Sequence, residues 1–131
     1  MGNPQCHVIL RGGLSGPNFS ADHVEPLAAR LEDQGLLARV MIDCSHANSG
    51  KNHEVQPEVA RDVADQVSGG SHHVFGVMLE SFLEDGRQDH DDTVRGGGPL
   101  VRGRSITDAC MSWERTEPVL DLLAEAVRKR R

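Results

Sequence analysis

The chain has 131 residues, with 20 acidic and 14 basic side chains and a formal net charge of −6, a length that suits one compact domain spanning residues 1–131. The acidic balance argues against nucleic-acid or membrane-surface binding, which requires a positive footprint, and an aromatic content of 3% argues against base stacking. Three widely spaced cysteines without a CxxC pair favour a reducing compartment. The first residues lack a signal-peptide pattern and no window reaches about 18 apolar residues, so we expect a cytoplasmic protein.

The first predicted unit is a strand followed by a helix. The segment His7–Gly13 has a short apolar core that ends at a glycine pair, as a buried strand bounded by a turn does. Ser20 is the expected N-cap of the helix, and Gly35 is expected to stop it. The same order of strand, polar loop and amphipathic helix recurs twice more, which is typical of an α/β fold with a parallel sheet.

The second unit begins at Ala38–Ser49. Three apolar residues in succession, Val40 to Ile42, predict a strand that is covered on both faces. Its helix is predicted from about Asn52 to Ser68, with valines spaced four residues apart on one face.

The third predicted strand is His73–Ser81. The polar stretch 82–104 that follows contains several glycines and the acidic run DHDD, and it is long enough to suggest a functional or mobile loop. Ser105–Met111 is expected to form a further turn, and the last helix is predicted from about Thr116 to Lys129.

Polar side chains stand at the end of each predicted strand. Arg11 follows the first strand, the run Asp43 to His46 follows the second, and Glu80 ends the third, while Asp108 lies shortly before the last helix. The carboxyl ends of parallel strands line the active sites of βα folds. One imidazole and two carboxylates form a mixed nitrogen and oxygen ligand set suited to Mn, Fe, Co or Zn.

Simpler roles stay open on the residues alone. His46 would cap its loop, Glu80 would face water, Asp108 would cap the last helix, and Arg11 would pair with a neighbouring acid. Cys44 near a histidine invites a nucleophile hypothesis, but a buried and unreactive cysteine is favoured because free cysteines are commonly core residues.

Five strings carry a family resemblance that runs nearly from end to end of the chain. The sequence resembles the C-terminal portion of the class I 3-deoxy-D-arabino-heptulosonate 7-phosphate (DAHP) synthases, the first enzymes of the shikimate pathway to aromatic amino acids. The strings are GNPQCHVILRGG, PNFSADHV, RVMIDCSHANSGKN, GVMLESFLEDG and SITDACMSWERTE.

The resemblance implies a metal-dependent enzyme with a TIM (β/α)8 barrel that condenses phosphoenolpyruvate with erythrose 4-phosphate. By their motifs, His46, Glu80 and Asp108 resemble three of the family's metal ligands, and Arg11 resembles an anchor for the phosphate or carboxylate of phosphoenolpyruvate. A divalent metal would polarise the aldehyde oxygen of the sugar for attack by the enol carbon, after which water adds and phosphate leaves.

The resemblance covers only part of such an enzyme. A TIM barrel takes about 250 residues, so the sequence predicts the last three βα units of an incomplete barrel. The family's cysteine ligand and its other phosphate-binding strands are not matched here, and the segment Asp89–Gly97 departs from the family pattern.

An open sheet of this kind has consequences for partners and activity. We expect two unpaired edges and exposed barrel-interior side chains at Val8, Leu10, Val40 and Val77 or their neighbours, which would favour self-association or a complementary N-terminal part. The isolated chain is expected to be inactive. The alternative is a non-catalytic metal- or phosphate-binding remnant that acts as an interaction module.

Overall fold

The structure is a computed structural model that describes residues 2–3, 6–90 and 99–131. Three parallel strands, β1 (Val8–Leu10), β2 (Val40–Asp43) and β3 (Val74–Met78), form a sheet in the order β1-β2-β3. The helices are α1 (Ala21–Asp33), α2 (Gln56–Ser68) and α3 (Trp113–Arg130), and the short 3-10 helix η1 (His46–Asn48) follows β2. The chain is therefore an α/β unit, as the sequence predicts.

The helices differ from the prediction mainly at their starts. α1 begins directly after the expected cap, Ser20, but the Ser20 hydroxyl contacts the Nδ1 atom of His23 at 3.0 Å and no side-chain hydrogen bond caps the helix. α2 begins at Gln56, after a series of turns that the valine spacing alone does not separate from the helix. α3 begins at Trp113, so the last helix is three residues longer at its start than predicted.

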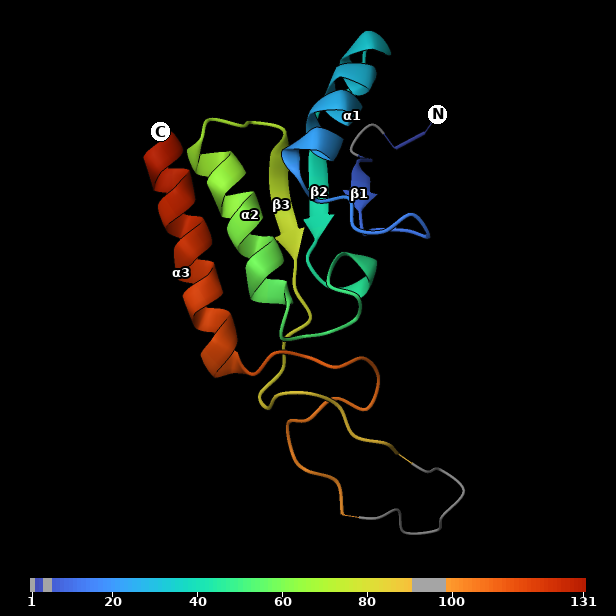
Figure 1. Cartoon of the computed structure of the whole chain (residues 1–131), viewed down its shortest axis with the longest axis vertical. Helices are drawn as coiled ribbons and strands as arrows, with labels where there is room; N and C mark the ends of the chain where they lie inside the picture. Colours follow the sequence, from blue (N-terminus) through green and yellow to red (C-terminus); the bar gives the residue numbers. More distant parts are fainter. Residues whose placement is uncertain (1, 4–5, 91–98) are drawn as a thin grey trace.

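The core lies between the sheet and α2, with α2 and α3 side by side (Figure 1). Alternate strand residues and one stripe of each helix supply the buried side chains, as period-2 and period-3.6 patterns require. They include Val40, Ile42 and Val74 from the sheet, Val59, Ala60, Val63, Ala64 and Val67 from α2, and Val119 and Ala126 from α3.

The prediction of exposed barrel-interior side chains left two sets of strand residues open, and the structure exposes the neighbours rather than the residues named first. Val40 is fully buried, and Val8, Leu10 and Val77 pack partly buried against the core. Their neighbours take the exposed face, with exposed fractions of 41% for Ile9, 46% for Phe75 and 36% for Met78. Because side chains alternate along a strand, the face is set by register, and a strand whose residues are all apolar does not reveal its register.

A long connection joins β3 to α3 at the carboxyl end of the sheet (Figure 1). Isolated bridges hold its two arms together: Ser81 with Met111, Gly86 with Cys110, and Arg87 with Ser105. The expected turn at 105–111 is therefore the returning arm of this connection. The segment 89–97 departs from the family pattern, and its residues from 91 onward lie outside the described residues.

Among the described residues, no helix has the length and apolar content needed to cross a membrane.

Candidate functional site

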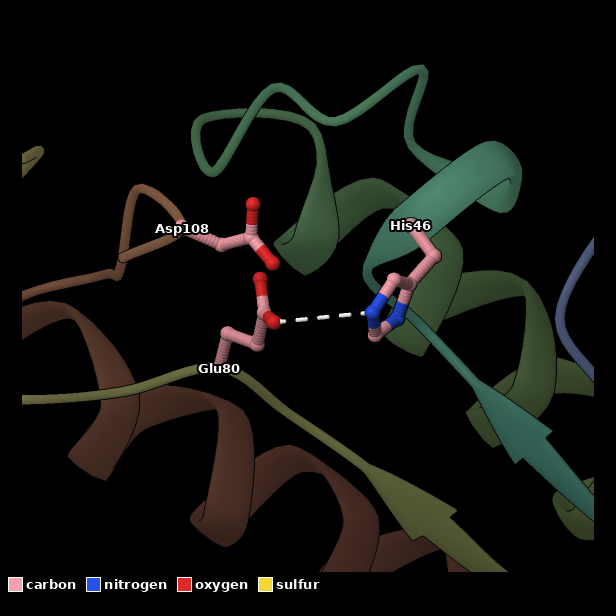
Figure 2. A group of neighbouring side chains, drawn as sticks. All are labelled: His46, Glu80 and Asp108. Carbon is pink, nitrogen blue, oxygen red and sulfur yellow. Dashed lines mark ion pairs between the residues drawn. The ribbon is translucent and has the colours of Figure 1, made fainter.

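The candidate site lies at the carboxyl ends of the three strands, where β2 leads to His46 and β3 leads to Glu80. Parallel strands end at a common edge of their sheet, which explains why residues 34 positions apart become neighbours. The returning arm of the long connection adds Asp108 from a third segment. Figure 2 shows the three side chains pointing toward one another.

The ligating atoms of His46, Glu80 and Asp108 all lie within 4.8 Å of one another. The Nε2 atom of His46 is 3.8 Å from the Oε1 atom of Glu80. Two metal bonds of about 2.1 Å span at most about 4.2 Å, so small side-chain rotations suffice for one cation to reach all three. The donor set therefore fits a divalent transition metal. The convergence expected from the sequence is present, and the role of these residues as ligands stays a prediction.

A compact network of hydrogen bonds surrounds His46. Its Nδ1 atom is 2.7 Å from Asp43 Oδ2 and 2.8 Å from Ser45 Oγ. The backbone of His46 has φ 43°, a left-handed conformation that is uncommon outside glycine. The backbone amide of Lys51 donates to the His46 carbonyl at 2.6 Å and helps to hold this turn.

Glu80 is held through its backbone by a buried glutamine at the start of α2. The Gln56 side-chain oxygen accepts from the Glu80 amide at 2.8 Å, and its side-chain nitrogen donates to the Glu80 carbonyl at 3.2 Å. Burial raises the pKa of the Glu80 carboxyl above its usual range, and the nearby carboxylates of Asp108 and Asp43 raise it further, while His46 lowers it. The carboxyl groups of Asp43, Glu80 and Asp108 thus lie close enough to influence one another, and such a cluster of acidic groups favours a cation.

Asp108 is exposed and is held by the connection rather than by a helix or strand. It does not cap α3, whose N-cap is Ser112. The Ser112 amide instead donates to Asp85 Oδ1 at 2.7 Å, which ties the outgoing arm of the connection to the start of α3. The capping role left open for Asp108 is therefore wrong.

Arg11 follows β1 at the same edge of the sheet but is not part of the three-residue group. Its side chain is 60% exposed, and its Nε atom is 4.0 Å from Asp43 Oδ2. The sequence left open a pairing of Arg11 with a neighbouring acid. The structure shows such a pairing with Asp43, at a distance too long for a hydrogen bond. Most of the guanidinium therefore stays available to an anion.

Neither Cys44 nor Cys110 has the properties of a nucleophile. Cys44 is fully buried, and burial together with the charge of Asp43 raises the pKa of its thiol to about 12. Burial also raises the pKa of the Cys110 thiol. The predicted burial of Cys44 in the core is confirmed. Because the thiolate is the reactive form, its raised pKa favours an unreactive thiol, which stays a prediction.

Sequence reasoning noted Asp43 at the end of the second predicted strand but missed the supporting roles of three polar residues. Asp43 and Gln56 support His46 and Glu80 directly, and Asn48 donates to the carbonyls of Leu10 and Asp43 at 3.0 and 2.8 Å. All three are buried. The close spacing of Asp43 and His46 was an available signal, whereas nothing in the sequence pairs Gln56 with a residue 24 positions later.

Comparison with known proteins places the chain in a family. The sequence matches the DAHP synthetase I family over residues 1–121. It is 51% identical over 130 residues to the tyrosine-inhibited phospho-2-dehydro-3-deoxyheptonate aldolase of Schizosaccharomyces pombe, covering 99% of this chain and 35% of that protein. It is 49% identical over 130 residues to the Phe-sensitive enzyme of that name from Escherichia coli, covering 99% and 36% respectively.

A solved structure agrees with these relatives. The phospho-2-dehydro-3-deoxyheptonate aldolase of Francisella tularensis superposes with a TM-score of 0.90 at 48% identity, covering 99% of this chain and 36% of that one. The chain thus spans about a third of the length of the relatives it matches. The chain belongs to the DAHP synthetase I family.

Proposed function

We propose that this chain supplies three of the metal ligands of a DAHP synthase. The complete enzyme would convert phosphoenolpyruvate, erythrose 4-phosphate and water to DAHP and phosphate, the first step toward chorismate and the aromatic amino acids. The observation that carries the proposal is the convergence of His46, Glu80 and Asp108 from three separate segments. The names of the relatives support the same reaction class.

Each of the three side chains has a defined part in this proposal. His46 offers the Nε2 atom, and Glu80 and Asp108 offer carboxylate oxygens, to one divalent ion drawn from Mn, Fe, Co and Zn. Such an ion, when bound, supplies Lewis-acid polarisation of the aldehyde oxygen of the sugar phosphate. The negative charge around Glu80 supports cation binding at this point.

Arg11 is proposed as an anchor for the phosphate or carboxylate of phosphoenolpyruvate. Its planar guanidinium can donate two parallel hydrogen bonds to two oxygens of one anion. Its exposure and its place at the end of β1, on the same edge of the sheet as His46, support this role.

We assign the chain, residues 1–131, as one partial domain of a TIM-barrel enzyme, and we propose that this enzyme is cytoplasmic. The substrate site is therefore incomplete within this chain. A complementary N-terminal part would add strands at the outer edges of β1 and β3 and cover the exposed Ile9, Phe75 and Met78. Without that part, positioning and charge stabilisation of both substrates are lost, so the isolated chain is expected to be inactive and to self-associate.

Metal binding tests the site directly. Titration of the 131-residue chain with Mn(II) in a calorimeter should give one binding event, weakened at least about tenfold by His46→Ala or Glu80→Gln. The matched controls are His72→Ala and Glu84→Gln, which change exposed side chains of the same types. Equal binding by all of these variants and the wild type would exclude a centre at this position.

Complementation tests the reaction. The remaining N-terminal segment of a relative, added to this chain with Mn(II) and both substrates, should produce DAHP, whereas either piece alone should not. A chain that binds Mn(II) or phosphate tightly but never restores activity would favour the alternative, a non-catalytic binding remnant that works as an interaction module.

A further inference from the structure

Asp43 is almost completely buried, with 2% of its side chain exposed, yet it is not one of the three candidate ligands. It ends β2 and lies three residues before His46. A buried carboxylate needs hydrogen-bond donors at both oxygens, so the identity of those donors shows what the side chain does.

The Oδ1 atom of Asp43 is occupied by Ser45. It accepts the Ser45 backbone amide at 2.8 Å and the Ser45 hydroxyl at 2.6 Å. A backbone amide can only donate, so the atom facing it must be an acceptor. This contact fixes the orientation of the whole carboxylate.

The Oδ2 atom consequently faces the imidazole of His46, with Nδ1 2.7 Å away. A carboxylate oxygen only accepts, so Nδ1 must carry the hydrogen. The Ser45 hydroxyl, 2.8 Å from Nδ1, already gives its hydrogen to Oδ1 and therefore also acts as an acceptor toward the ring. In a neutral imidazole the other nitrogen, Nε2, is then unprotonated.

We propose that Asp43 is a positioning residue that selects the Nδ1–H tautomer of His46 and so presents a bare Nε2 lone pair to the cation. This inference rests on the proposed function, because it concerns how the same site is prepared for metal. The Nε2 atom is the one that lies 3.8 Å from Glu80 Oε1, on the side where the three candidate ligands converge (Figure 2).

The backbone supports this role. His46 has φ 43°, a conformation that costs a non-glycine residue free energy and persists where surrounding contacts over-determine it. The ring contacts to Asp43 and Ser45 and the hydrogen bond from the Lys51 amide to the His46 carbonyl are such contacts. They hold the ring with Nδ1 toward Asp43 and Nε2 toward Glu80.

The replacement Asp43→Asn separates orientation from packing, because the two side chains have nearly the same shape. The asparagine oxygen must stay opposite the Ser45 amide, which places the NH2 group against Nδ1 of His46. Arg11 also lies near Asp43, but its Nε atom is 4.0 Å from Oδ2, too far for a hydrogen bond that would draw the asparagine oxygen to the Oδ2 position. Nδ1 must then accept, and the hydrogen moves to Nε2.

The tautomer is measurable without metal. Long-range ¹H–¹⁵N spectra of the 131-residue chain in alkaline buffer with a chelator should show His46 as Nδ1–H in the wild type and as Nε2–H in Asp43→Asn. Mn(II) affinity measured by calorimetry should fall about 10- to 100-fold in Asp43→Asn. Ser45→Ala is the matched control, because it keeps the backbone donor to Oδ1 and should retain the Nδ1–H tautomer.

The outcomes separate the two proposals. A wild-type chain that binds Mn(II) but carries Nε2–H before binding would overturn the positioning role alone, and this measurement needs no variant to fold. Full Mn(II) affinity in a folded Asp43→Asn chain would overturn it as well. A wild-type chain that binds no Mn(II) would contradict the proposed function itself.

Discussion

Gly12, which follows Arg11 after β1, is the position where one added methyl group should disturb the site most. Its φ is +74°, and a Cβ built there would lie 2.7 Å from the Ala47 carbonyl carbon, 2.8 Å from Ala47 Cβ and 2.8 Å from the Asn48 nitrogen. All three atoms belong to η1, the short helix that carries His46. Two of them are backbone atoms, so a rotamer change cannot relieve the contact.

The cost of Gly12→Ala has two parts. A left-handed conformation costs an alanine about 1–2 kcal/mol, and forcing a methyl group into a packed contact costs about 1–3 kcal/mol. We therefore expect the free energy of unfolding to fall by about 2–5 kcal/mol. The loss should be visible as a lower urea midpoint at unchanged m-value, followed by circular dichroism.

Two nearby glycines provide matched controls. Gly16 has φ +111° with nothing within 4 Å of its built Cβ, so Gly16→Ala should show only the conformational cost, about 1–2 kcal/mol. Gly13 has open space and no left-handed conformation, so Gly13→Ala should change stability by less than about 0.5 kcal/mol. If Gly12→Ala is no more destabilising than Gly16→Ala, the close contact with η1 does not exist in solution.

Three further predictions follow from burial. Cys44, with its thiol pKa raised to about 12, should resist an aromatic disulfide reagent at pH 8 in the folded chain while the exposed Cys6 reacts, and equal rates for the two thiols would contradict the burial of Cys44. The pKa of Glu80 is raised in the folded chain, so the folded chain binds the Glu80 proton more tightly than the unfolded chain does. The stability that this proton contributes is fully present below the unfolded pKa, 4.5, and is lost over the interval in which the pH rises from there through the folded pKa. In metal-free buffer Glu80→Gln should therefore gain stability relative to the wild type across that interval, and a relative loss would show that the shift has the opposite sign. Gln56→Ala leaves the Glu80 amide and carbonyl without their partner and should cost about 1–3 kcal/mol in urea unfolding, whereas the exposed control Gln34→Ala should be nearly neutral.

The arrangement of elements was predictable because three apolar runs alternate with amphipathic helices, and alternating strands and helices strongly favour a parallel sheet. The convergence of His46 and Glu80 followed from the same rule, since both stand just beyond strand ends. The strand faces were not predictable. Val8 and Ile9 are both apolar, so composition does not distinguish the residue that packs against the core from the one on the open face.

The residues that support the site escaped prediction for a related reason. Gln56 and Asn48 act by hydrogen-bonding backbone groups that are distant in sequence, and any residue can present a carbonyl or an amide. Asp108 was a candidate by its place before the last helix and by its motif, but its position beside Glu80 was not predictable, because the returning arm that brings it there has neither periodicity nor regular secondary structure. Long-range contacts to the backbone leave no pattern in a single sequence.

The side chain of Asn48 bridges the ends of two neighbouring strands and so depends on their register. Its amide group donates to the last residue of β1 and to the last residue of β2, and its oxygen accepts from Asn18 at 2.8 Å. A slip of β1 against β2 by one residue would displace the partners of Asn48 on the β1 side, the Leu10 carbonyl and the Asn18 amide, and leave buried polar groups of Asn48 unpaired. Misregistered forms of the sheet are thus disfavoured, and because Asn48 and His46 belong to the same short helix, η1, the pairing of β1 with β2 is coupled to the placement of the imidazole.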